Sequence, residues 1–329
     1  MRAFMMQTAD APPRLTETAR PDPGPGEVRI RVAACGLNFA DLLMIAGKYQ
    51  DTPALPFTLG MEIAGTVEVC GPDVQAPAPG TRVAAFIGAG GLADHAVCDA
   101  ARCTPLPATM TMIEGAGFQI AYGTSHLGLA HRARLQPGET LLVLGAAGGV
   151  GLTAVEIGAQ MGARVVAVAR GAEKLEVARA AGAEVLIDSA AESDLRATFK
   201  ALGGVDVVYD AVGEPAASAA LRALRPEGRF LAIGFAGGEV PRFPANLLLV
   251  KNISVLGLYW GGYLRFAPQV LTDSLTELMR WHAEGQLHPH VSHVLPLVRV
   301  AEGLDLLKAR KATGKVVITM EDPEDQPVR

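Results

Sequence analysis

Cysteine is scarce in this chain: Cys35, Cys70, Cys98 and Cys103 are the only four among 329 residues. Four scattered cysteines are too few for a disulfide framework in a chain of this length, so we expect reduced thiols. Long apolar runs are also missing, since none reaches the roughly 20 residues that a membrane-spanning helix needs. Residues 1–14 lack the order of charged, apolar and small residues that marks a signal peptide. We therefore expect a cytoplasmic protein with no membrane insertion.

Clusters of basic residues are absent as well. The chain has 29 Lys and Arg against 34 Asp and Glu, a net charge of −5, and no segment gathers the basic residues. This distribution excludes the electrostatic footprint of a nucleic-acid-binding protein. Hydrophobic residues make up 50% of the chain, which at this length is enough to fill two cores. We expect a two-domain protein that binds a small molecule and no nucleic acid.

The most informative stretch is Thr140 to Gly162, TLLVLGAAGGVGLTAVEIGAQMG. It begins with an apolar run typical of a strand buried on both faces, and a glycine-rich turn follows. Apolar residues then recur at helical spacing, at Val150, Ala154, Ile157 and Met161. A strand, a tight turn and a helix in this order predict a phosphate-binding turn. The reason is that a helix N-terminus offers unpaired N–H groups and the positive end of its dipole to a pyrophosphate.

The glycines of this turn have separate roles. Gly148 lets the backbone approach the phosphates, and Gly151 lets the helix pack close to the strand. Ala146 stands where the usual fingerprint has its first glycine, so the motif is A-x-G-x-x-G. The residues that we expect beside the cofactor phosphates are Ala147, Gly148, Gly149, Val150 and Gly151.

The rest of the chain divides into two patterns. Before residue 120, short strand candidates at 27–35, 63–69 and 82–87 are separated by Pro and Gly turns, which predicts a small, mostly β domain. Helical spacing begins at 115–129, and from Thr140 strands and helices alternate. The expected strands are 164–169, 185–187, 205–209 and 229–234, and the expected helices are 173–181, 193–202 and 215–224. Such alternation implies a parallel sheet with helices on both faces, hence an α/β fold.

The C-terminal part fits neither pattern by itself. Two amphipathic helices at 268–284 and 299–310 precede a final strand at 315–319. We expect them to close the first domain around an inserted nucleotide domain, giving 1–120 with 260–329 and, between them, 121–259. The acidic residues 320–329 are expected to form a frayed tail.

The end of the second strand of the nucleotide domain indicates which cofactor binds. A site that prefers NAD has an acidic residue there, which holds the ribose 2′-hydroxyl. Here the strand 164–169 ends in Arg170, which can clamp a 2′-phosphate, and Lys174 can add a second cation. The alternative is a solvated basic pair, but cations at a helix start oppose the helix dipole. The pattern therefore predicts NADPH as the cofactor.

Several segments together resemble one family. They are CGLNFADLLMIAGKY (35–49), LPFTLGMEIAGTV (55–67), the AAGGVG turn, YDAVG (209–213) and ATGKVVI (312–318). The chain resembles the zinc-independent, zeta-crystallin-like quinone oxidoreductases of the medium-chain dehydrogenase/reductase superfamily. The resemblance implies a β-rich GroES-like catalytic domain and a Rossmann NADPH-binding domain.

Zinc alcohol dehydrogenases, which the chain also resembles, differ at two positions. They have a cysteine ligand where Asn38 stands and a histidine ligand where Met61 stands between Gly60 and Glu62. An amide and a thioether cannot replace a thiolate and an imidazole as ligands of a catalytic Zn²⁺, so we expect no metal. The histidines of the H-x-H-x-x-H segment 288–293 lack an acidic or cysteine neighbour in sequence, and we interpret the segment as a polar strand or loop.

The resemblance also implies the remaining site residues. Asn38, Tyr49 and Thr124 correspond to catalytic positions, and Asn38 could hold either a ring substituent of the cofactor or a substrate carbonyl. Further cofactor contacts are implied at Ser189, Val212, Gly213, Phe235, Ala236 and Lys315. Alternatives remain for some of them, since Phe235 could belong to the core and Asn38 could only cap a turn.

These assignments predict a reductase that transfers hydride from NADPH to a quinone or a similar conjugated carbonyl. One alternative is reduction of an enone or an enoyl thioester. The other is an NADPH-binding protein of low turnover, crystallin-like or a sensor, because a fold and a cofactor site can persist without chemistry. The sequence does not decide between these acceptors.

The apolar run Leu247 to Tyr259 predicts the assembly. We expect it to form the last strand of the nucleotide domain's sheet, and Lys251 is the only charged residue in the run. An apolar edge strand exposes unpaired backbone groups, and a second copy of the chain would cover them. We therefore expect a homodimer, a state that the resemblance also implies. The alternative is an edge covered by the chain's own C-terminal helices.

Overall fold

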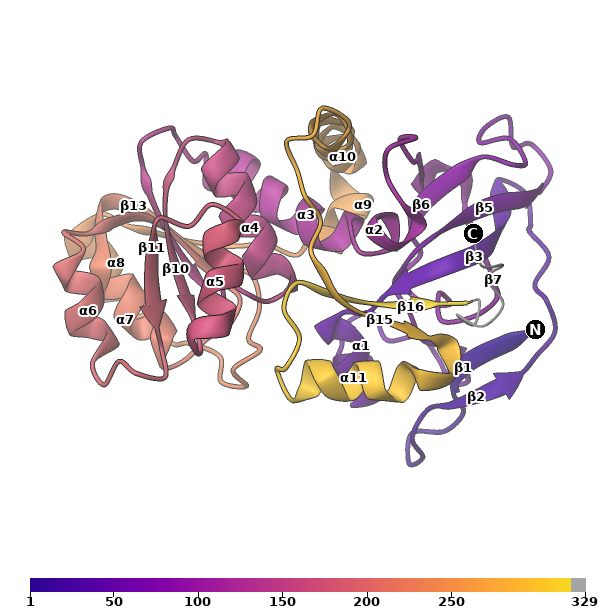
Figure 1. Ribbon diagram of the computed structural model, residues 1–329, viewed down its shortest axis with the longest axis horizontal. Helices are drawn as coiled ribbons and strands as arrows, with labels where there is room; N and C mark the ends of the chain where they lie inside the picture. Colours follow the sequence, from indigo (N-terminus) through magenta and orange to yellow (C-terminus); the bar gives the residue numbers. More distant parts are fainter. Residues whose placement is uncertain (321–329) are drawn as a thin grey trace. The chain divides into compact units, whose positions relative to one another are not determined.

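The computed structural model describes residues 1–320, and the predicted acidic tail beyond Met320 lies outside them (Figure 1). The chain forms two compact units. Unit 1 comprises Met1–Ile120 and the segment from Pro289 onward, and unit 2 comprises Ala121–His288. Residues 260–288 thus belong to unit 2, whereas the sequence placed them with the first domain. The helix at 268–283 is held there by a His126–Ser274 hydrogen bond of 2.8 Å and by edge-to-face stacking of His126 on Trp281.

Unit 1 is built mainly from antiparallel strands. Its elements are β1 (Arg2–Met6), β2 (Arg14–Glu17), β3 (Glu27–Gly36), α1 (Phe39–Ile45), β4 (Phe57–Thr58), β5 (Glu62–Cys70), β6 (Arg82–Phe86), β7 (His95–Asp99), β8 (Cys103–Pro105), α2 (Met112–Ala116), β15 (Val291–Pro296), α11 (Val300–Lys308) and β16 (Lys315–Thr319). The main sheet has the order β15-β16-β3-β5-β6-β8, β7 also pairs with β3, and a smaller sheet has the order β2-β1-β4. The predicted strands at 27–35, 63–69, 82–87 and 315–319 are confirmed within a residue or two.

Unit 2 alternates strands and helices as the sequence predicted. Its elements are α3 (Gln119–His126), which begins at the end of unit 1, a π-helical turn (Leu127–Arg132), β9 (Thr140–Leu144), α4 (Gly149–Gln160), β10 (Arg164–Ala169), α5 (Ala172–Ala180), β11 (Val185–Asp188), α6 (Leu195–Ala201), β12 (Val205–Asp210), α7 (Ala216–Ala223), β13 (Leu224–Ala232), α8 (Ala245–Lys251), β14 (Ser254–Gly257), α9 (Tyr263–Phe266) and α10 (Pro268–Ala283). The parallel sheet has the order β11-β10-β9-β12-β13-β14. The chain reverses its direction of winding beside β9, and such a switch point is where α/β sheets bind ligands, at the carboxyl ends of the strands.

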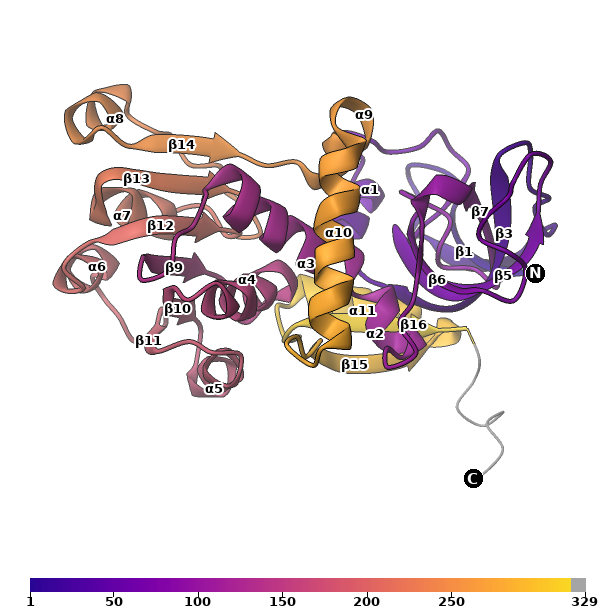
Figure 2. The same cartoon turned by 90° about the horizontal axis from the view of Figure 1, so that it is seen from above.

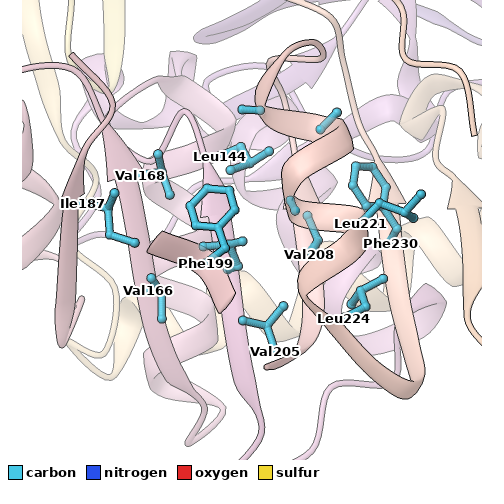
Figure 3. Packing of buried hydrophobic residues seen from close by; sticks show 14 of the residues in the cluster. Leu144, Val166, Val168, Ile187, Phe199, Val205, Val208, Leu221, Leu224 and Phe230 are labelled. Carbon is cyan, nitrogen blue, oxygen red and sulfur yellow. The ribbon is translucent and has the colours of Figure 1, made fainter. Parts of the chain in front are cut away.

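The sheet of unit 2 is covered on both faces, and this confirms the α/β fold class. Figure 2 shows α4 and α5 on one face and α6, α7 and α8 on the other. Leu144 and Phe199 pack within the core between the sheet and the second group of helices (Figure 3). On the opposite face, α4 comes so close that a Cβ at Gly158 would meet Leu141. Strand β9 is therefore buried on both sides, as its continuous apolar run predicted.

The expected strand over Leu247–Tyr259 is wrong in its first half. Residues 245–251 form α8, and only Ser254–Gly257 forms the edge strand β14. In α8, Leu247 and Leu248 pack on the core while Leu249 and Val250 are 77% and 73% exposed, which is a helical pattern of burial. Periodicity cannot separate a helix from a strand in a continuous apolar run, and this is why the prediction failed. Among residues 1–320, no helix is both long and apolar enough to cross a membrane.

Candidate cofactor and catalytic sites

The glycine turn after β9 has the geometry of a phosphate-binding turn. Gly145 has φ +74°, and a Cβ at Gly151 would clash with the carbonyl oxygen of Gly145, so the close approach of α4 to the strand requires glycine. Gly148 differs, because it is exposed and a Cβ there would approach nothing closer than 3.4 Å. A ligand lying against the turn would fill that space, which is the fit expected for a bound pyrophosphate.

The backbone N–H groups of the first turn of α4 lie beside the same space next to Gly148. Gly148 is the N-cap residue, and no side chain caps the helix there. The first N–H groups of an α-helix have no partner within the helix, so those of Gly149 and Val150 are available to an anion. Ala147, by contrast, is buried, and its side chain packs against Ala169 and Leu175.

The end of β10 carries the predicted basic residues and one acidic residue that the sequence analysis missed. Arg170 is exposed and makes no hydrogen bond or ion pair within residues 1–320, and Lys174 lies in the first turn of α5. Asp188 ends the neighbouring strand β11, and its carboxylate accepts hydrogen bonds from the N–H of Gly171 at 2.9 Å and of Ala190 at 2.8 Å. These bonds lower the pKa of Asp188, so this carboxylate is ionised close to the predicted 2′-phosphate residues.

Ser189 lies at the same strand end. Its hydroxyl donates to the carbonyl of Ala169 at 3.2 Å, and its N–H donates to the same oxygen at 2.9 Å. Asp188 and Ser189 are brought beside Arg170 only because β11 pairs with β10. The signal that could have found Asp188 is its position at the end of an expected strand.

The turns after β12 and β13 are joined to each other. Gly237 N–H donates to Val212 at 2.7 Å, and Ala236 N–H donates to Ala211 at 3.2 Å. Gly213 has φ +90°, and a Cβ there would clash with the carbonyl of Glu239. Phe235 is 37% exposed, so it is not a core residue. The predicted contacts Val212, Gly213, Phe235 and Ala236 therefore share the carboxyl edge of the sheet with the glycine turn.

Asp210 shapes this edge and was not foreseen. It is fully buried, and one carboxylate oxygen accepts the N–H groups of Val212 at 2.8 Å and Gly213 at 2.9 Å. Its other oxygen has no partner within residues 1–320. Burial raises the pKa of this carboxyl above its usual value.

Thr124 lies on α3 and is 7% exposed, beside a buried group of hydroxyls. The next residue, Ser125, contacts the carbonyl of Val150 and Thr153 Oγ1, each at 2.8 Å, and the Tyr209 hydroxyl at 3.0 Å. Burial raises the pKa of Tyr209, so its phenol stays neutral. This network ties α3 to α4 and β12, and it fixes Thr124 relative to the glycine turn within unit 2.

In unit 1, the predicted residues Asn38 and Lys315 meet in one buried cluster with Glu62. Lys315 Nζ donates to Glu62 Oε1 at 2.7 Å, to Asn38 Oδ1 at 2.8 Å and to the carbonyl of Leu37 at 2.8 Å. Asn38 Nδ2 donates to Glu62 Oε1 at 3.0 Å and to the carbonyl of Gly36 at 3.2 Å. The second oxygen of Glu62 accepts the N–H of Ile120 at 2.9 Å.

This cluster limits what two of the predicted residues can do. An ammonium group has only three N–H donors, and all three of Lys315 are used inside unit 1. The geometry therefore disfavours the predicted direct contact between Lys315 and the cofactor. Asn38 is the N-cap residue of α1, and its side chain is also a member of the cluster, so it does more than cap a turn.

Asp41 and Tyr49 lie next along the chain. Asp41 is fully buried in α1, and its carboxylate accepts the N–H groups of Asn38 at 2.8 Å and Gly60 at 3.2 Å. Burial raises the pKa of Asp41 to about 6, although the two N–H groups and Lys315 oppose that effect. Tyr49 is half-buried in the loop after α1, where its carbonyl accepts the hydroxyl of Thr52.

Comparison with known proteins identifies the family. A family model described as an alcohol dehydrogenase GroES-like domain matches residues 24–108, and one described as a zinc-binding dehydrogenase matches residues 149–280. Quinone oxidoreductase-like protein 2 of Bos taurus is 39% identical over 94% of this chain and 90% of the relative. The chain belongs to the quinone oxidoreductase-like family of the medium-chain dehydrogenase/reductase superfamily. It is therefore an oxidoreductase of that family, with the GroES-like and Rossmann folds that the sequence predicted.

Solved structures of the same superfamily agree in fold. The quinone oxidoreductase of Thermus thermophilus, solved alone and in complex with NADPH, is 34% identical with a TM-score of 0.86, and the match covers 97% of this chain and all of that one. The quinone oxidoreductase of Escherichia coli, solved as a complex with NADPH, is 27% identical with a TM-score of 0.89, again over 97% of this chain and all of that one.

At the two positions where zinc alcohol dehydrogenases have metal ligands, this quinone oxidoreductase-like chain has Asn38 and Met61. Met61 is buried, Asn38 is hydrogen-bonded to Glu62, and the Lys315 ammonium lies beside both Asn38 and Glu62. In the described part of the chain, no group of three or more His, Cys, Asp and Glu side chains is arranged to hold a metal. The histidines of the 288–293 segment each have a separate partner: Glu156 for His288, Thr313 for His290 and Ser292 for His293.

Proposed function

We propose that this chain is an NADPH-dependent reductase that transfers hydride to a quinone or a similar conjugated carbonyl compound without a metal. The observation that carries the proposal is the glycine turn between β9 and α4, with the exposed Arg170 at the end of the adjacent strand β10. Bound NADPH would supply the hydride.

The nucleotide-binding residues separate into two groups by chemistry. The turn Ala147–Gly151 would hold the pyrophosphate through the backbone N–H groups at the start of α4. Arg170 and Lys174 would pair with the 2′-phosphate, for which a guanidinium offers paired hydrogen bonds. Ser189, Val212, Gly213, Phe235 and Ala236 lie at the same carboxyl edge of the sheet and would line the rest of the cofactor.

The catalytic side has to stabilise the oxyanion that develops as the carbonyl is reduced. We assign this role to the Tyr49 hydroxyl, because a phenolic hydroxyl is a hydrogen-bond donor. Asn38 and Thr124 would orient the reactants, which contributes to rate by holding donor and acceptor in near-attack geometry. For a quinone the reduced product can take its remaining proton from water.

The donor set at the positions of the zinc ligands supports the proposed metal independence. An amide that already donates to a carboxylate and a buried thioether are poor ligands for Zn²⁺. The ammonium of Lys315 at 2.7 Å from Glu62 adds a positive charge beside them, which opposes the binding of a second cation.

The test is steady-state oxidation of NADPH and NADH with 1,4-benzoquinone, 9,10-phenanthrenequinone, enones and enoyl thioesters. We expect turnover with the quinones, a preference for NADPH, and no change after dialysis against EDTA. Turnover restricted to enones or enoyl thioesters would assign the acceptor to the alternative class. Tight NADPH binding with no turnover on any acceptor would instead identify a binding protein.

The proposal includes a cytoplasmic homodimer. Strand β14 is an edge strand of the parallel sheet, and the helix α8 before it exposes Leu249 and Val250. Pairing of β14 with its copy across a two-fold axis would satisfy the edge and cover these side chains.

A further inference from the structure

Unit 2 contains a cavity at the opposite end of its sheet from the predicted cofactor residues. The cavity has a volume of about 740 Å³, and every residue that lines it belongs to unit 2. Its lining includes Glu139, which precedes β9, and Ser254, which begins β14. Both residues mark the amino-terminal ends of strands, whereas the glycine turn follows the carboxyl end of β9. A strand as long as β9 spans roughly 16 Å, so the cavity and the glycine turn are separate places.

The lining of this cavity carries an excess of positive charge. Arg132 ends the π-helical turn, Arg134 follows it, and Arg229 lies on β13. Within the described part of the chain, Glu139 is the only carboxylate in the lining, and its two oxygens accept hydrogen bonds from Arg229, each at 2.7 Å. These bonds lower the pKa of Glu139, so the two side chains form an ion pair at neutral pH. Even without His131, which also lines the cavity, two guanidinium charges remain uncompensated.

The two uncompensated charges are those of Arg132 and Arg134. Within residues 1–320, neither guanidinium makes a hydrogen bond or an ion pair. The Nε of Arg132 is buried without a partner, and its terminal nitrogens, which are not buried, have none either. Asp206, whose charge reaches Glu139, is already paired with Arg225 at 2.6 Å. Because a guanidinium is always charged and carries five N–H donors, an anion in the cavity would supply the missing acceptors.

The cavity lies over one face of the outermost strand, β14, which pairs with β13 (Figure 2). Val255 packs on the core beneath α8, and side chains alternate in direction along a strand. Its neighbours Ser254 and Leu256 therefore face the other way, into the lining of the cavity. A second copy of the chain that paired with β14 would use the backbone groups in the plane of the sheet. The proposed dimer would thus leave this face open to a ligand.

We propose that this cavity is a second ligand site, distinct from the cofactor site, and that it binds a small phosphate ester through Arg132 and Arg134. A phosphate monoester carries a charge of about −1.5 to −2 at neutral pH, which matches two uncompensated arginines better than a monocarboxylate does. Guanidinium groups also bind phosphate oxygens through paired hydrogen bonds. The volume lies within the range of about 300–1,000 Å³ that is typical of small-molecule sites. It leaves space beside the phosphate for an organic group in contact with Leu256.

The first experiment is a calorimetric titration of the full chain with ribose 5-phosphate, inorganic phosphate and acetate at constant ionic strength. We expect one ribose 5-phosphate per chain, bound more tightly than inorganic phosphate, and weaker binding of acetate. Saturating NADPH and the Arg170→Ala variant should leave this binding unchanged. Loss of binding in either case would place the phosphate at the predicted cofactor residues and overturn the proposal. Equal affinities for ribose 5-phosphate and inorganic phosphate would overturn the assignment to an ester, and equal binding of acetate would overturn the assignment to a phosphate.

The second experiment removes the two arginines, neither of which would leave a partner unpaired within residues 1–320. Arg132→Met keeps the aliphatic stem and should weaken ribose 5-phosphate by about 13- to 160-fold, the equivalent of a hydrogen bond to a charged group. Arg134 has φ +51°, a left-handed conformation that glycine adopts without strain, so Arg134→Gly should keep the fold. Because Arg134 is exposed, its loss should weaken the ligand by only about 1.4- to 5-fold.

Arg164→Ala is the matched control for these variants. Arg164 is exposed and begins β10 at the same amino-terminal edge of the sheet, but it does not line the cavity. The control should keep the full affinity for ribose 5-phosphate, and all three variants should keep the affinity for NADPH. Thermal unfolding gives a second readout, since ribose 5-phosphate should raise the Tm of the unmutated protein and of the control but not that of Arg132→Met. An unmutated protein that binds no ribose 5-phosphate, unchanged affinity in Arg132→Met, or an equal loss in the control refutes the proposal.

Discussion

The proposed preference for NADPH depends on one exposed side chain, Arg170, whose removal is simple to interpret. Arg170 has no hydrogen bond or ion pair within residues 1–320, so Arg170→Ala leaves no partner unpaired in the free protein. The change in affinity then reports the contact with the ligand alone. A hydrogen bond to a charged group contributes about 1.5–3 kcal/mol, so the dissociation constant of NADPH should rise by about 13- to 160-fold. The constant for NADH should change by less than about 2-fold, since the 2′-phosphate is absent.

A variant at Asp188 tests the same cofactor preference, but it is expected to increase the preference for NADPH. Its carboxylate is held beside the end of β10 by the N–H groups of Gly171 and Ala190, and the depressed pKa keeps it ionised at neutral pH. Asp188→Asn keeps the oxygen that accepts these bonds and removes the charge. It should increase the preference for NADPH by about 2- to 6-fold, the size expected for exposed charges about 4–10 Å apart in water.

The assay is a titration of cofactor fluorescence with NADPH and NADH at two salt concentrations. The loss caused by Arg170→Ala should shrink at high salt, because exposed charges are screened over about 10 Å at 0.1 M. Arg179→Ala is the control, since Arg179 lies on the same helix α5, is exposed and forms an ion pair with Glu176 one helical turn away. Equal affinities of the unmutated protein for the two cofactors, or an equal loss of both in Arg170→Ala, would refute the reasoning.

Other features of the structure make four further predictions. Gly151→Ala should destabilise the protein in urea by about 1–3 kcal/mol through its clash in the turn, whereas Gly148→Ala should leave stability nearly unchanged and weaken NADPH binding. The raised pKa of Asp41 means that the native state binds more protons than the unfolded state between pH 3.8 and about 6. The free energy of unfolding should therefore fall by about 3 kcal/mol as the pH rises through that range. An Asp41→Asn variant that keeps the same pH dependence would contradict this. Purified protein should contain no stoichiometric zinc, and elemental analysis that finds one zinc per chain, lost together with activity, would overturn the metal-free assignment. Val255→Pro should convert a dimer into a 34.3 kDa monomer by light scattering, and a monomeric unmutated protein would exclude the dimer.

Most of unit 2 could be predicted from local patterns. The strand β9, the turn and α4 lie within about two dozen consecutive residues, and each step is encoded by neighbours: an apolar run, glycines at the turn, then helical spacing. The prediction failed at 247–251 because a continuous apolar run has no periodicity, so the choice between helix and strand there depends on which side chains reach the core. The placement of 260–288 in unit 2 likewise depends on contacts of α10 with His126, which are far away in the sequence.

The sequence by itself determined the glycine turn between β9 and α4, the alternation of strands and helices and the basic end of β10, because these features are made by residues close together in the chain. Only the tertiary structure placed Asp188 at the end of β10, where it accepts the N–H of Gly171, since that contact requires β11 to pair with β10. It also brought Asn38 to its hydrogen-bond partners Glu62 and Lys315, which are 24 and 277 residues away. Strand pairing in unit 1 brings these distant side chains together, and a pattern read along the chain cannot contain a pairing of buried charges that lie so far apart in sequence.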